Sequence, residues 1–314
     1  DRFGVLLSAY RDGDVALFND TLKEYTAALQ RENPAVLEKM PFENFYNRLG
    51  AFMKSAQLYL LVFVLSCFGW LARKRGPISA GLTLMVCAFI PHTFAIIARV
   101  FLSGYPPVTN LYSSAIFIGW AAVLAGIVLE RVYRKAEGMG NLVGGIAGFT
   151  TLLVAHFLAG DGDTMEQMRA VLDTRFWLAT HVITVTLGYM ATFVAGTIGL
   201  FYILAGLLTR RLDEATRENM YRMMYGTACF ALLLSFVGTV LGGLWADDSW
   251  GRFWGWDPKE NGALLIVIWN AIMLHAKYGK MVGSRGFAVM AVFGNIVTAW
   301  SWFGVNQLSV GLHS

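Results

Sequence analysis

Long apolar segments separated by short polar loops run through most of this chain and restrict how it can fold. A helix of about 20 apolar residues crosses the hydrocarbon core of a bilayer. Eight segments reach or approach this length: 52–71, 78–101, 111–129, 141–159, 177–208, 223–244, 262–276 and 287–305. The fifth is longer than one crossing needs, so we expect it to tilt or to project from the membrane, whereas the seventh is short.

Composition supports the same interpretation. Hydrophobic residues make up 56% of the 314 and charged residues only 15%, values that are too apolar for an ordinary soluble protein. We therefore predict an all-α fold, a polytopic membrane bundle of about eight transmembrane helices. The net charge of +4 is explained by cytoplasmic loops that face anionic lipid, and it indicates no nucleic-acid partner.

The distribution of Lys and Arg predicts the orientation. One set of alternate loops holds Arg73, Lys74, Arg75, Arg131, Arg134, Lys135, Arg210, Arg211, Arg217, Arg222, Lys277, Lys280 and Arg285. The other set holds only Arg169, Arg175, Arg252 and Lys259. Because short cytoplasmic loops are enriched in basic residues, the first set is expected in the cytoplasm and both termini outside it.

Residues 1–50 are polar and are expected to form an extracytoplasmic amphipathic segment, followed by a transmembrane domain over residues 51–314. Apolar side chains recur at helical spacing at Val15, Phe18, Leu22, Tyr25 and Leu29. Asp14 could cap the start of this helix and Pro34 lies beyond its end, so one amphipathic helix is predicted. The chain begins at Asp1 without a signal peptide, and we expect a processed or excerpted chain.

The loop at 245–262 is polar but rich in tryptophan. Trp250, Trp254 and Trp256 lie in the sequence WGRFWGWDPKE and account for three of the ten tryptophans. Indole rings can form a shelf for a flat apolar ligand such as haem, and they can also anchor helix ends at a membrane interface. Residue types alone leave both interpretations open.

The run WGRFWGWD followed by PKE resembles the tryptophan-rich WWD motif of the haem-handling membrane proteins of cytochrome c maturation, and the chain from about Leu49 onward is similar to their CcsA (ResC) branch. Further matches are RVFLSGYPPVTNLYSS (99–114), FWLATHVITVTLGY (176–189) and GVNQLSVGLHS (304–314). The resemblance implies haem export and attachment, with haem presented on the extracytoplasmic side for thioether formation with the CxxCH motif of apocytochrome c. Some members are fused to a ResB-type (CcsB) half, and this chain could be the C-terminal half of such a CcsBA fusion.

The resemblance also implies a set of ligands for haem b. His181 and His313 match the two external histidines that flank the tryptophan motif and would bind the external haem iron from opposite faces. His275 matches the intramembrane histidine that binds haem iron near the cytoplasmic side. The remaining residues expected to bind haem are Trp250, Gly251, Arg252, Trp254, Trp256 and Asp257.

Charged residues near the tryptophans have two interpretations each. Arg252 and Lys259 could offset the haem propionates or contact lipid headgroups. Asp257 and Glu260 would repel propionates, so we expect them to cap a helix or to orient a His or Trp.

The family resemblance implies partners and a location. The partners are a ResB/CcsB-type membrane protein, separate or fused, the apocytochrome c, and a thioredoxin-like thiol reductant. Together with the first of these the chain would form a holocytochrome c synthase (haem lyase), and no residue looks like a catalytic nucleophile of its own. The expected location is the cytoplasmic (inner) membrane, with the thylakoid membrane as the alternative.

Other residues fit no haem position. His92 and His156 are expected to form hydrogen bonds with neighbouring helices, and His92 is also a candidate for a proton or haem path. Cys67, Cys87 and Cys229 form no CxxC pair, so small core residues are expected. Two rival functions remain, a cytochrome b-like electron-transfer subunit and a non-enzymatic membrane transporter.

Overall fold

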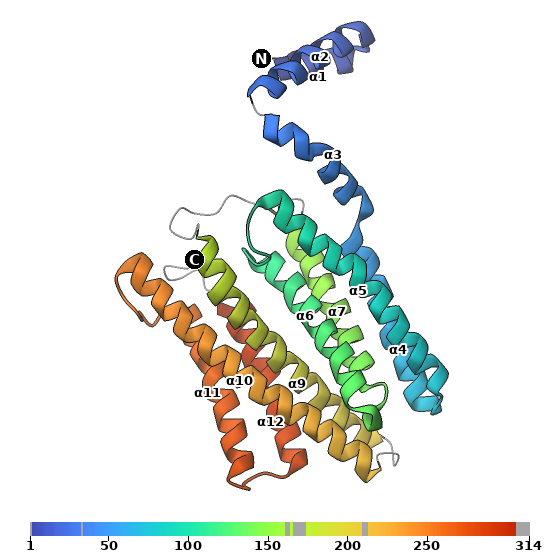
Figure 1. Ribbon diagram of the computed structural model, residues 1–314, viewed down its shortest axis with the longest axis vertical. Coiled ribbons are helices and arrows are strands. Elements are labelled where there is room, and N and C mark those ends of the chain that lie inside the picture. The colour runs from blue at the N-terminus through green and yellow to red at the C-terminus, as the bar shows by residue number, and fades with distance from the viewer. Residues whose placement is uncertain (1, 33, 161–163, 166–173, 209–212, 306–314) are drawn as a thin grey trace. The chain divides into compact units, whose positions relative to one another are not determined.

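The computed structural model describes residues 2–32, 34–160, 164–165, 174–208 and 213–305 of the chain (Figure 1). These residues form helices joined by short connections, and no strand occurs among them. The all-α prediction is therefore confirmed. The chain separates into two compact units, Asp1–Gly50 and Ala51–Ser314.

The first unit contains three helices, α1 (Arg2–Asp12), α2 (Val15–Glu32) and α3 (Pro34–Leu49). The prediction of a single helix was wrong, although α2 matches the predicted one. Asp14 caps α2 as predicted, since its carboxylate accepts a hydrogen bond of 3.0 Å from the Leu17 N–H. Pro34 begins α3, where its missing N–H would have had no helical partner.

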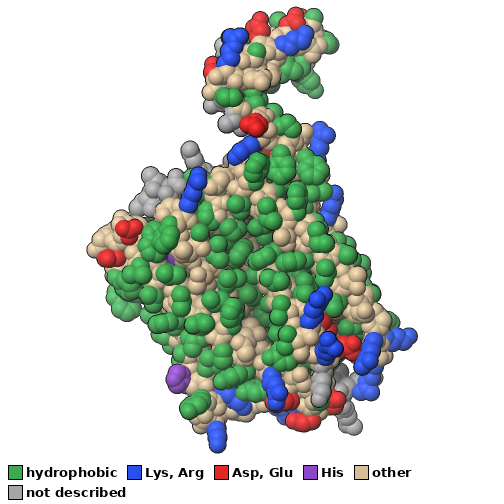
Figure 2. All heavy atoms as spheres, in the orientation of Figure 1, with side chains coloured by type: hydrophobic (Ala, Val, Ile, Leu, Met, Phe, Trp, Pro, Cys, Tyr) green, Lys and Arg blue, Asp and Glu red, His purple; other side chains and the backbone are tan. Residues whose placement is uncertain are grey.

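The second unit holds the long apolar helices. Their order is α4 (Ala51–Ala72), α5 (Arg75–Ser103), α6 (Leu111–Val132), η1 (Arg134–Ala136), α7 (Met139–Ala159), α8 (Arg175–Trp177), η3 (Leu178–Val182), α9 (Ile183–Leu208), α10 (Glu214–Trp250), α11 (Pro258–Tyr278), α12 (Ser284–Ala299) and η4 (Trp300–Gly304). Figure 2 shows hydrophobic side chains over most of the visible middle of this unit. Exposed apolar surface of this extent suits a lipid environment.

Within the described ranges, seven helical stretches are long and apolar enough to cross a membrane, and the chain is a multi-pass membrane protein. The first stretch includes α4, and the others follow α5, α6, α7, Arg175–Leu208, α10 and Ser284–Gly304. The remaining predicted segment, the short seventh one at 262–276, lies in α11, whose 21 residues include Lys259, Glu260, Asn270 and Lys277. With these polar residues, α11 is not among the described stretches that are long and apolar enough to cross a membrane.

The fifth predicted segment exceeds one crossing, as expected. The helical stretch Arg175–Leu208 has 34 residues, which corresponds to about 50 Å of helix against about 30 Å of hydrocarbon.

Small residues allow the central helices to approach closely. Helix α9 packs against α10, α12 and α6, and it runs through the middle of the second unit (Figure 1). A Cβ atom added to Gly238 of α10 would lie 2.7 Å from the Val185 Cα atom of α9, so only glycine fits there. Close backbone approach of this kind is how helices associate where surrounding lipid removes the usual hydrophobic driving force.

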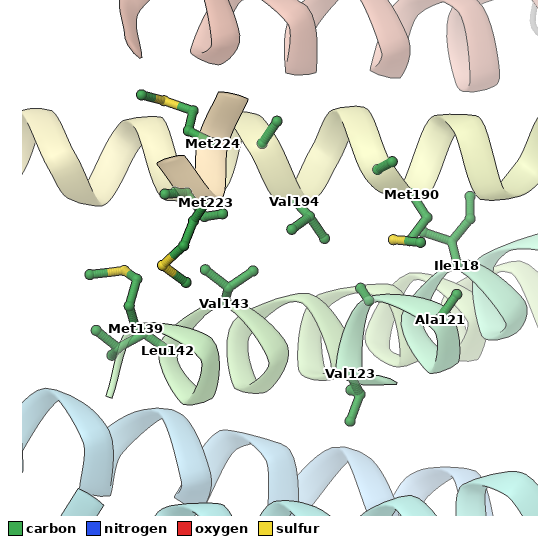
Figure 3. Close-up of a cluster of buried hydrophobic side chains, with 14 of the residues drawn as sticks. Ile118, Ala121, Val123, Met139, Leu142, Val143, Met190, Val194, Met223 and Met224 are labelled. Carbon is green, nitrogen blue, oxygen red and sulfur yellow. The ribbon is translucent and has the colours of Figure 1, made fainter. Parts of the chain in front are cut away.

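Methionine and valine fill the space between α7, α9 and α10. Figure 3 shows Val143 of α7 and Val194 of α9 facing the same interface, with Met223 of α10 between them. All three are almost fully buried. Flexible thioether side chains fill irregular gaps between helices whose backbones approach unevenly.

The cysteines are less buried than expected, although Cys67 packs against the buried core. Cys87 is exposed on α5, while Cys67 and Cys229 are half-buried, and all three are free thiols. Exposure on a membrane-spanning helix satisfies an apolar thiol as well as burial does, because lipid surrounds that surface.

Candidate functional site

A cavity of about 300 Å³ lies where α6, α9, α10, α11 and η4 meet at one end of the second unit. Aromatic and aliphatic side chains make up most of its wall: Val108, Leu111, Val182, Val185, Tyr189, Trp245, Trp250, Phe253, Trp254 and Trp302. The polar groups in it include His181, Asn110, Ser114, Lys259, Glu260 and Ser301. An apolar wall with a few placed polar groups is typical of a small-molecule site.

His181 projects into this cavity from the π-helical turn η3. Its Nδ1 atom lies 2.7 Å from the Gly238 carbonyl oxygen of α10. A carbonyl oxygen can only accept a hydrogen bond, so Nδ1 carries the proton. The lone pair of the neutral ring is then on Nε2, the nitrogen that can bind a metal.

Two neighbours on α10 fix the plane of this ring. The Trp245 indole packs on it with 5.7 Å between ring centroids. The ring also lies close to Gly242, where an added Cβ would come within 2.6 Å of the His181 Cε1 atom. The absence of a side chain at Gly242 makes room for the imidazole.

Both π-helical turns of the described chain line the cavity. η3 contributes His181, and η4 contributes Ser301 and Trp302. Such turns are rare and occur frequently at functional sites, because the widened turn directs side chains that an α-helix would place elsewhere. The Trp177 Nε1–H donates to the Asp248 carboxylate at 3.2 Å, which ties the segment before η3 to the end of α10.

The tryptophan loop runs from the end of α10 to the start of α11. Gly251 ends α10 in the left-handed conformation with φ of 67°, and its N–H donates to the Asp247 carbonyl. Asp257 caps α11 by accepting from the Lys259 N–H at 2.9 Å. The Glu260 carboxylate accepts from the N–H groups of Gly255 and Asp257, which completes a capping box. The predicted role of these two carboxylates as helix caps is confirmed.

The three indoles of the loop do not form one shelf. Trp250 and Trp254 line the cavity, whereas the Trp256 side chain is 70% exposed and contacts Trp254 edge to face at 6.1 Å. Trp256 also has a φ of 58°, which is unfavourable for a residue other than glycine. The Asn261 side-chain amide holds this turn by donating to the Trp256 carbonyl at 2.9 Å.

Charged groups of the loop face one another or the cavity. Arg252 forms an ion pair with Glu260 at 3.7 Å, and the cavity is not lined by Arg252 itself. Lys259 does line it. Burial lowers the pKa of the Lys259 ammonium group, and the nearby Asp257 carboxylate opposes that shift.

The opposite wall is the turn before α6, held in place by Arg99. The buried Arg99 guanidinium donates to the carbonyl and hydroxyl oxygens of Thr164 at 2.8 and 2.9 Å and lies 4.9 Å from the Tyr112 ring centroid. The Asn110 amide donates to the same Thr164 carbonyl. Asn110 also caps α6 by accepting from the Ser113 N–H. Residues 99–112 therefore shape this wall.

Other predicted residues lie elsewhere. His275 is exposed on α11, about 18 Å along the helix from Ala263 of the cavity, and its Nδ1–H donates to the Ala271 carbonyl. His313 lies outside the described residues. His92 is buried and bonded to the Tyr59 hydroxyl of α4 at 3.2 Å, which confirms its expected bond to a neighbouring helix, while His156 is exposed at the end of α7.

Sequence reasoning did not single out Trp245, Tyr189, Ser301 or Trp302 as site residues. Trp245 and Trp302 sit at the ends of apolar segments, where an interfacial anchor is the simpler interpretation. In the fold, the Trp302 Nε1–H donates to Ser114 at 3.0 Å and joins η4 to α6. Their proximity to His181 depends on helix packing, which no local pattern encodes.

The cavity suits a planar ligand with a metal and a polar edge. The buried Trp245 Nε1 and Ser301 Oγ atoms lack a hydrogen-bond partner in the described part of the chain, and both residues line the cavity. Buried polar groups normally have partners, so two orphaned ones indicate a missing polar ligand atom or water. With the His181 Nε2 lone pair and the aromatic wall, the residues present fit haem.

Comparisons with known proteins identify the family of this chain. The family described as "Cytochrome C assembly protein" matches residues 108–313, a range that includes every residue lining the cavity. The chain belongs to this family. A role in cytochrome c assembly follows from that membership.

Several relatives align with most of this chain. Protein NrfI of Wolinella succinogenes is 30% identical over 289 residues, which cover 88% of this chain and 31% of NrfI. The cytochrome c biogenesis protein CcsA of a Synechococcus species is 27% identical over 293 residues, 82% of this chain and 94% of CcsA. CcsA of Cycas taitungensis is 28% identical over 301 residues, 81% and 92% of the two chains. The chain thus spans about a third of NrfI and nearly all of each CcsA.

Proposed function

We propose that this family member holds haem at the His181 cavity and presents it for covalent attachment to apocytochrome c. The observation that carries the proposal is the state of His181. Its Nδ1 proton is donated to the Gly238 carbonyl, so the lone pair of the neutral ring is on Nε2, the nitrogen that can bind iron, and the ring lines an aromatic cavity. Free haem b is the form expected before attachment.

The indoles and the charged groups have separate tasks in this proposal. Trp245, Trp250 and Trp254 supply flat apolar surface for a porphyrin. Lys259 provides a cation that can pair with a propionate, while Glu260 is already engaged by two backbone N–H groups. A carboxylate held in a capping box repels a propionate less than one that points freely into the cavity.

Haem supplies the vinyl groups to which the two thiols of the CxxCH segment add, each thiol S–H adding across one carbon–carbon double bond. For this addition the chain's own residues provide position. His181 would hold haem through its iron, and Trp245 and Gly242 restrict the orientation of the His181 ring. Holding reacting groups at contact distance accounts for a large part of such a rate enhancement without any acid or base.

Further parts of the proposal come from the family resemblance. His313 would be the second axial ligand to the external iron, and His275 a ligand to a haem nearer the cytoplasmic side. A ResB/CcsB-type membrane protein and a thioredoxin-like reductant would complete a holocytochrome c synthase. The location proposed for it is the bacterial inner membrane, with the haem site facing outward.

The test compares His181→Ala with His156→Ala, since His156 is exposed on α7 and absent from the cavity wall. Each variant is produced with its ResB-type partner and an apocytochrome c. We expect the wild type and His156→Ala to purify with a low-spin bis-imidazole haem spectrum and to form holocytochrome c. His181→Ala should lose most of both, and added imidazole should restore part of the output.

Two results would contradict the proposal. Wild-type haem content and holocytochrome c output from His181→Ala would reject His181 as a ligand. A colourless wild-type protein that still crosses the membrane correctly would favour the transporter alternative.

A further inference from the structure

A second cavity, of about 530 Å³, lies at the other end of the second unit from His181. It opens between the start of α5, the end of α6 and η1, and its wall consists of Arg75, Ile78, Ser79, Leu82, Glu130, Arg131, Arg134 and Glu137. Ser114 and Glu130 lie on the same helix, α6, and mark the two cavities about 24 Å apart along it. We call this second cavity the arginine groove.

The floor of the arginine groove is rigid because Glu130 is held from several sides. Its carboxylate accepts hydrogen bonds from the N–H groups of Gly138 at 2.5 Å and Gly140 at 2.8 Å, at the start of α7. The Asn141 side-chain amide then ties α7 to α5 by donating to the Ile78 carbonyl at 2.9 Å. Three helices and η1 are thereby fixed around the groove.

These bonds also remove Glu130 as a partner for the arginines. The carboxylate is buried, and the partial positive charge of the α7 amino terminus already offsets it. Glu137 pairs with Arg75 at 3.1 Å, but the Arg75 side chain remains 87% exposed. Within the described ranges, no ion pair forms at Arg131 or Arg134. The groove therefore carries an excess of positive charge.

The groove combines this charge with apolar surface at the ends of two membrane-spanning helices. Arg75 is the first residue of the α5 span, and Arg131 lies in the last turn of the α6 span. Half-buried Leu82 continues the groove along α5 toward the apolar belt of the unit, next to Ile78, which is almost fully buried. Figure 2 shows charged side chains gathered at one end of that belt. A soluble anion would need the arginines alone, whereas the adjoining apolar wall suits an acyl chain.

We propose that the arginine groove binds the headgroup of an anionic phospholipid of the phosphatidylglycerol type. The phosphodiester pairs with Arg75, Arg131 and Arg134, and an acyl chain lies along Ile78 and Leu82. Basic pockets between membrane-spanning helices are suited to anionic headgroups. Guanidinium groups favour this contact because their planar donors match phosphate oxygens. This proposal does not depend on the haem-handling function.

The experiment measures bound lipid by native mass spectrometry of the purified full chain, delipidated in detergent and then mixed with equal amounts of phosphatidylglycerol and phosphatidylcholine. One variant combines Arg75→Gln, Arg131→Gln and Arg134→Gln. Its matched control combines Arg217→Gln, Arg222→Gln and Arg285→Gln, which remove three arginines from α10 and α12. Arg134→Gln alone serves if the triple variant fails to fold.

We expect the wild type and the control to retain phosphatidylglycerol about tenfold better than phosphatidylcholine, equivalent to about 1.4 kcal/mol. The triple variant should lose this preference, and the single variant should reduce it. Equal retention of both lipids by the wild type would overturn the proposal, as would an unchanged preference in the triple or single variant. Displacement of the lipid by millimolar inorganic phosphate would show a soluble-anion site and would also overturn it.

Discussion

Trp254 and Trp256 stand two residues apart in one loop, yet the fold gives their side chains different surroundings. Trp254 lines the His181 cavity, and Trp256 is 70% exposed with an unfavourable positive φ. A residue in this conformation costs on the order of 1–3 kcal/mol unless its surroundings offset the strain. The sequence motif gives no reason to expect different roles for the two indoles, and the difference is visible only in the structure.

Alanine substitutions should separate them in function. We expect Trp254→Ala to lower haem occupancy severalfold, because part of the cavity wall is lost. Trp256→Ala should have a much smaller effect on haem, since its indole lies outside the wall. Haem content per protein, measured by the pyridine haemochrome absorbance of each purified variant, tests this. Equal loss in both variants would mean that haem contacts the loop from its exposed side.

Gly242 should matter because it makes room for the His181 ring. A methyl group there would come within 2.6 Å of Cε1, whereas the nearest atom to a methyl group at Gly226 on the same helix is 3.9 Å away. We expect Gly242→Ala to rotate the imidazole and to weaken haem binding severalfold, with Gly226→Ala as the unaffected control. Haem titration of both variants in detergent provides the measurement, and identical affinities would show that the ring has room to move.

At the scale of the elements, helix ends contribute as much to the site as helix faces do. The capping box at the start of α11 fixes the tryptophan loop, and the Asn110 cap fixes the wall opposite it. Each cap satisfies backbone N–H groups that would otherwise lack partners at a buried helix start. The loop geometry therefore depends more on the side chains that cap these helices than on the indoles.

Glu130 tests the same principle at the other end of the unit. Glu130→Ala leaves the buried N–H groups of Gly138 and Gly140 without their acceptor, which should cost on the order of 1–3 kcal/mol. Glu137→Ala removes only an exposed ion pair with Arg75 and should cost about 1 kcal/mol or less. Thermal unfolding in detergent, followed by circular dichroism, should show the larger drop in Tm for Glu130→Ala. A similar drop for both would indicate that water replaces the carboxylate.

At the scale of the whole molecule, hydropathy alone predicted the positions of the long helices. Segments such as 111–129 and 141–159 lie inside α6 and α7, because length and apolar content decide which segments can enter a bilayer. The polar first unit was less predictable, since amphipathic periodicity identified α2 and missed α1 and α3. The hydrophobic periodicity of its short helices is a weaker signal than the long apolar run of a membrane span.

Residues of the site could be predicted from the sequence only where they belong to a recognisable motif. His181, Trp250 and Trp254 were expected from resemblance and line the cavity. Helix capping by Asp257 and Glu260 was one of two roles expected from their repulsion of propionates. Trp245 and Trp302 were not expected, because their approach to His181 depends on packing between α9, α10 and η4. The π-helical turns also leave no trace in hydrophobic periodicity.

The predicted orientation concerns the molecule as a whole and stays a prediction. In a background without native cysteines, Trp256→Cys should react with a membrane-impermeant maleimide added outside the cell. Arg134→Cys should react only after the membrane is opened, because its loop belongs to the basic set. Both side chains are exposed, so access depends on the side of the membrane. Reversed labelling would place the His181 cavity in the cytoplasm.

The widened turn at η3 has a consequence for insertions and deletions. A π-helical turn holds one more residue than an α-helical turn. Losing one residue from Leu178–Val182 would let an unbroken α-helix run from Arg175 into α9, so the membrane crossing would survive. The segment ahead of the deletion, however, would swing by about 100° about the helix axis, and Trp177 would leave Asp248. A single-residue gap in an aligned homologue at this point would therefore indicate a protein that keeps the membrane span but directs the segment before η3 elsewhere.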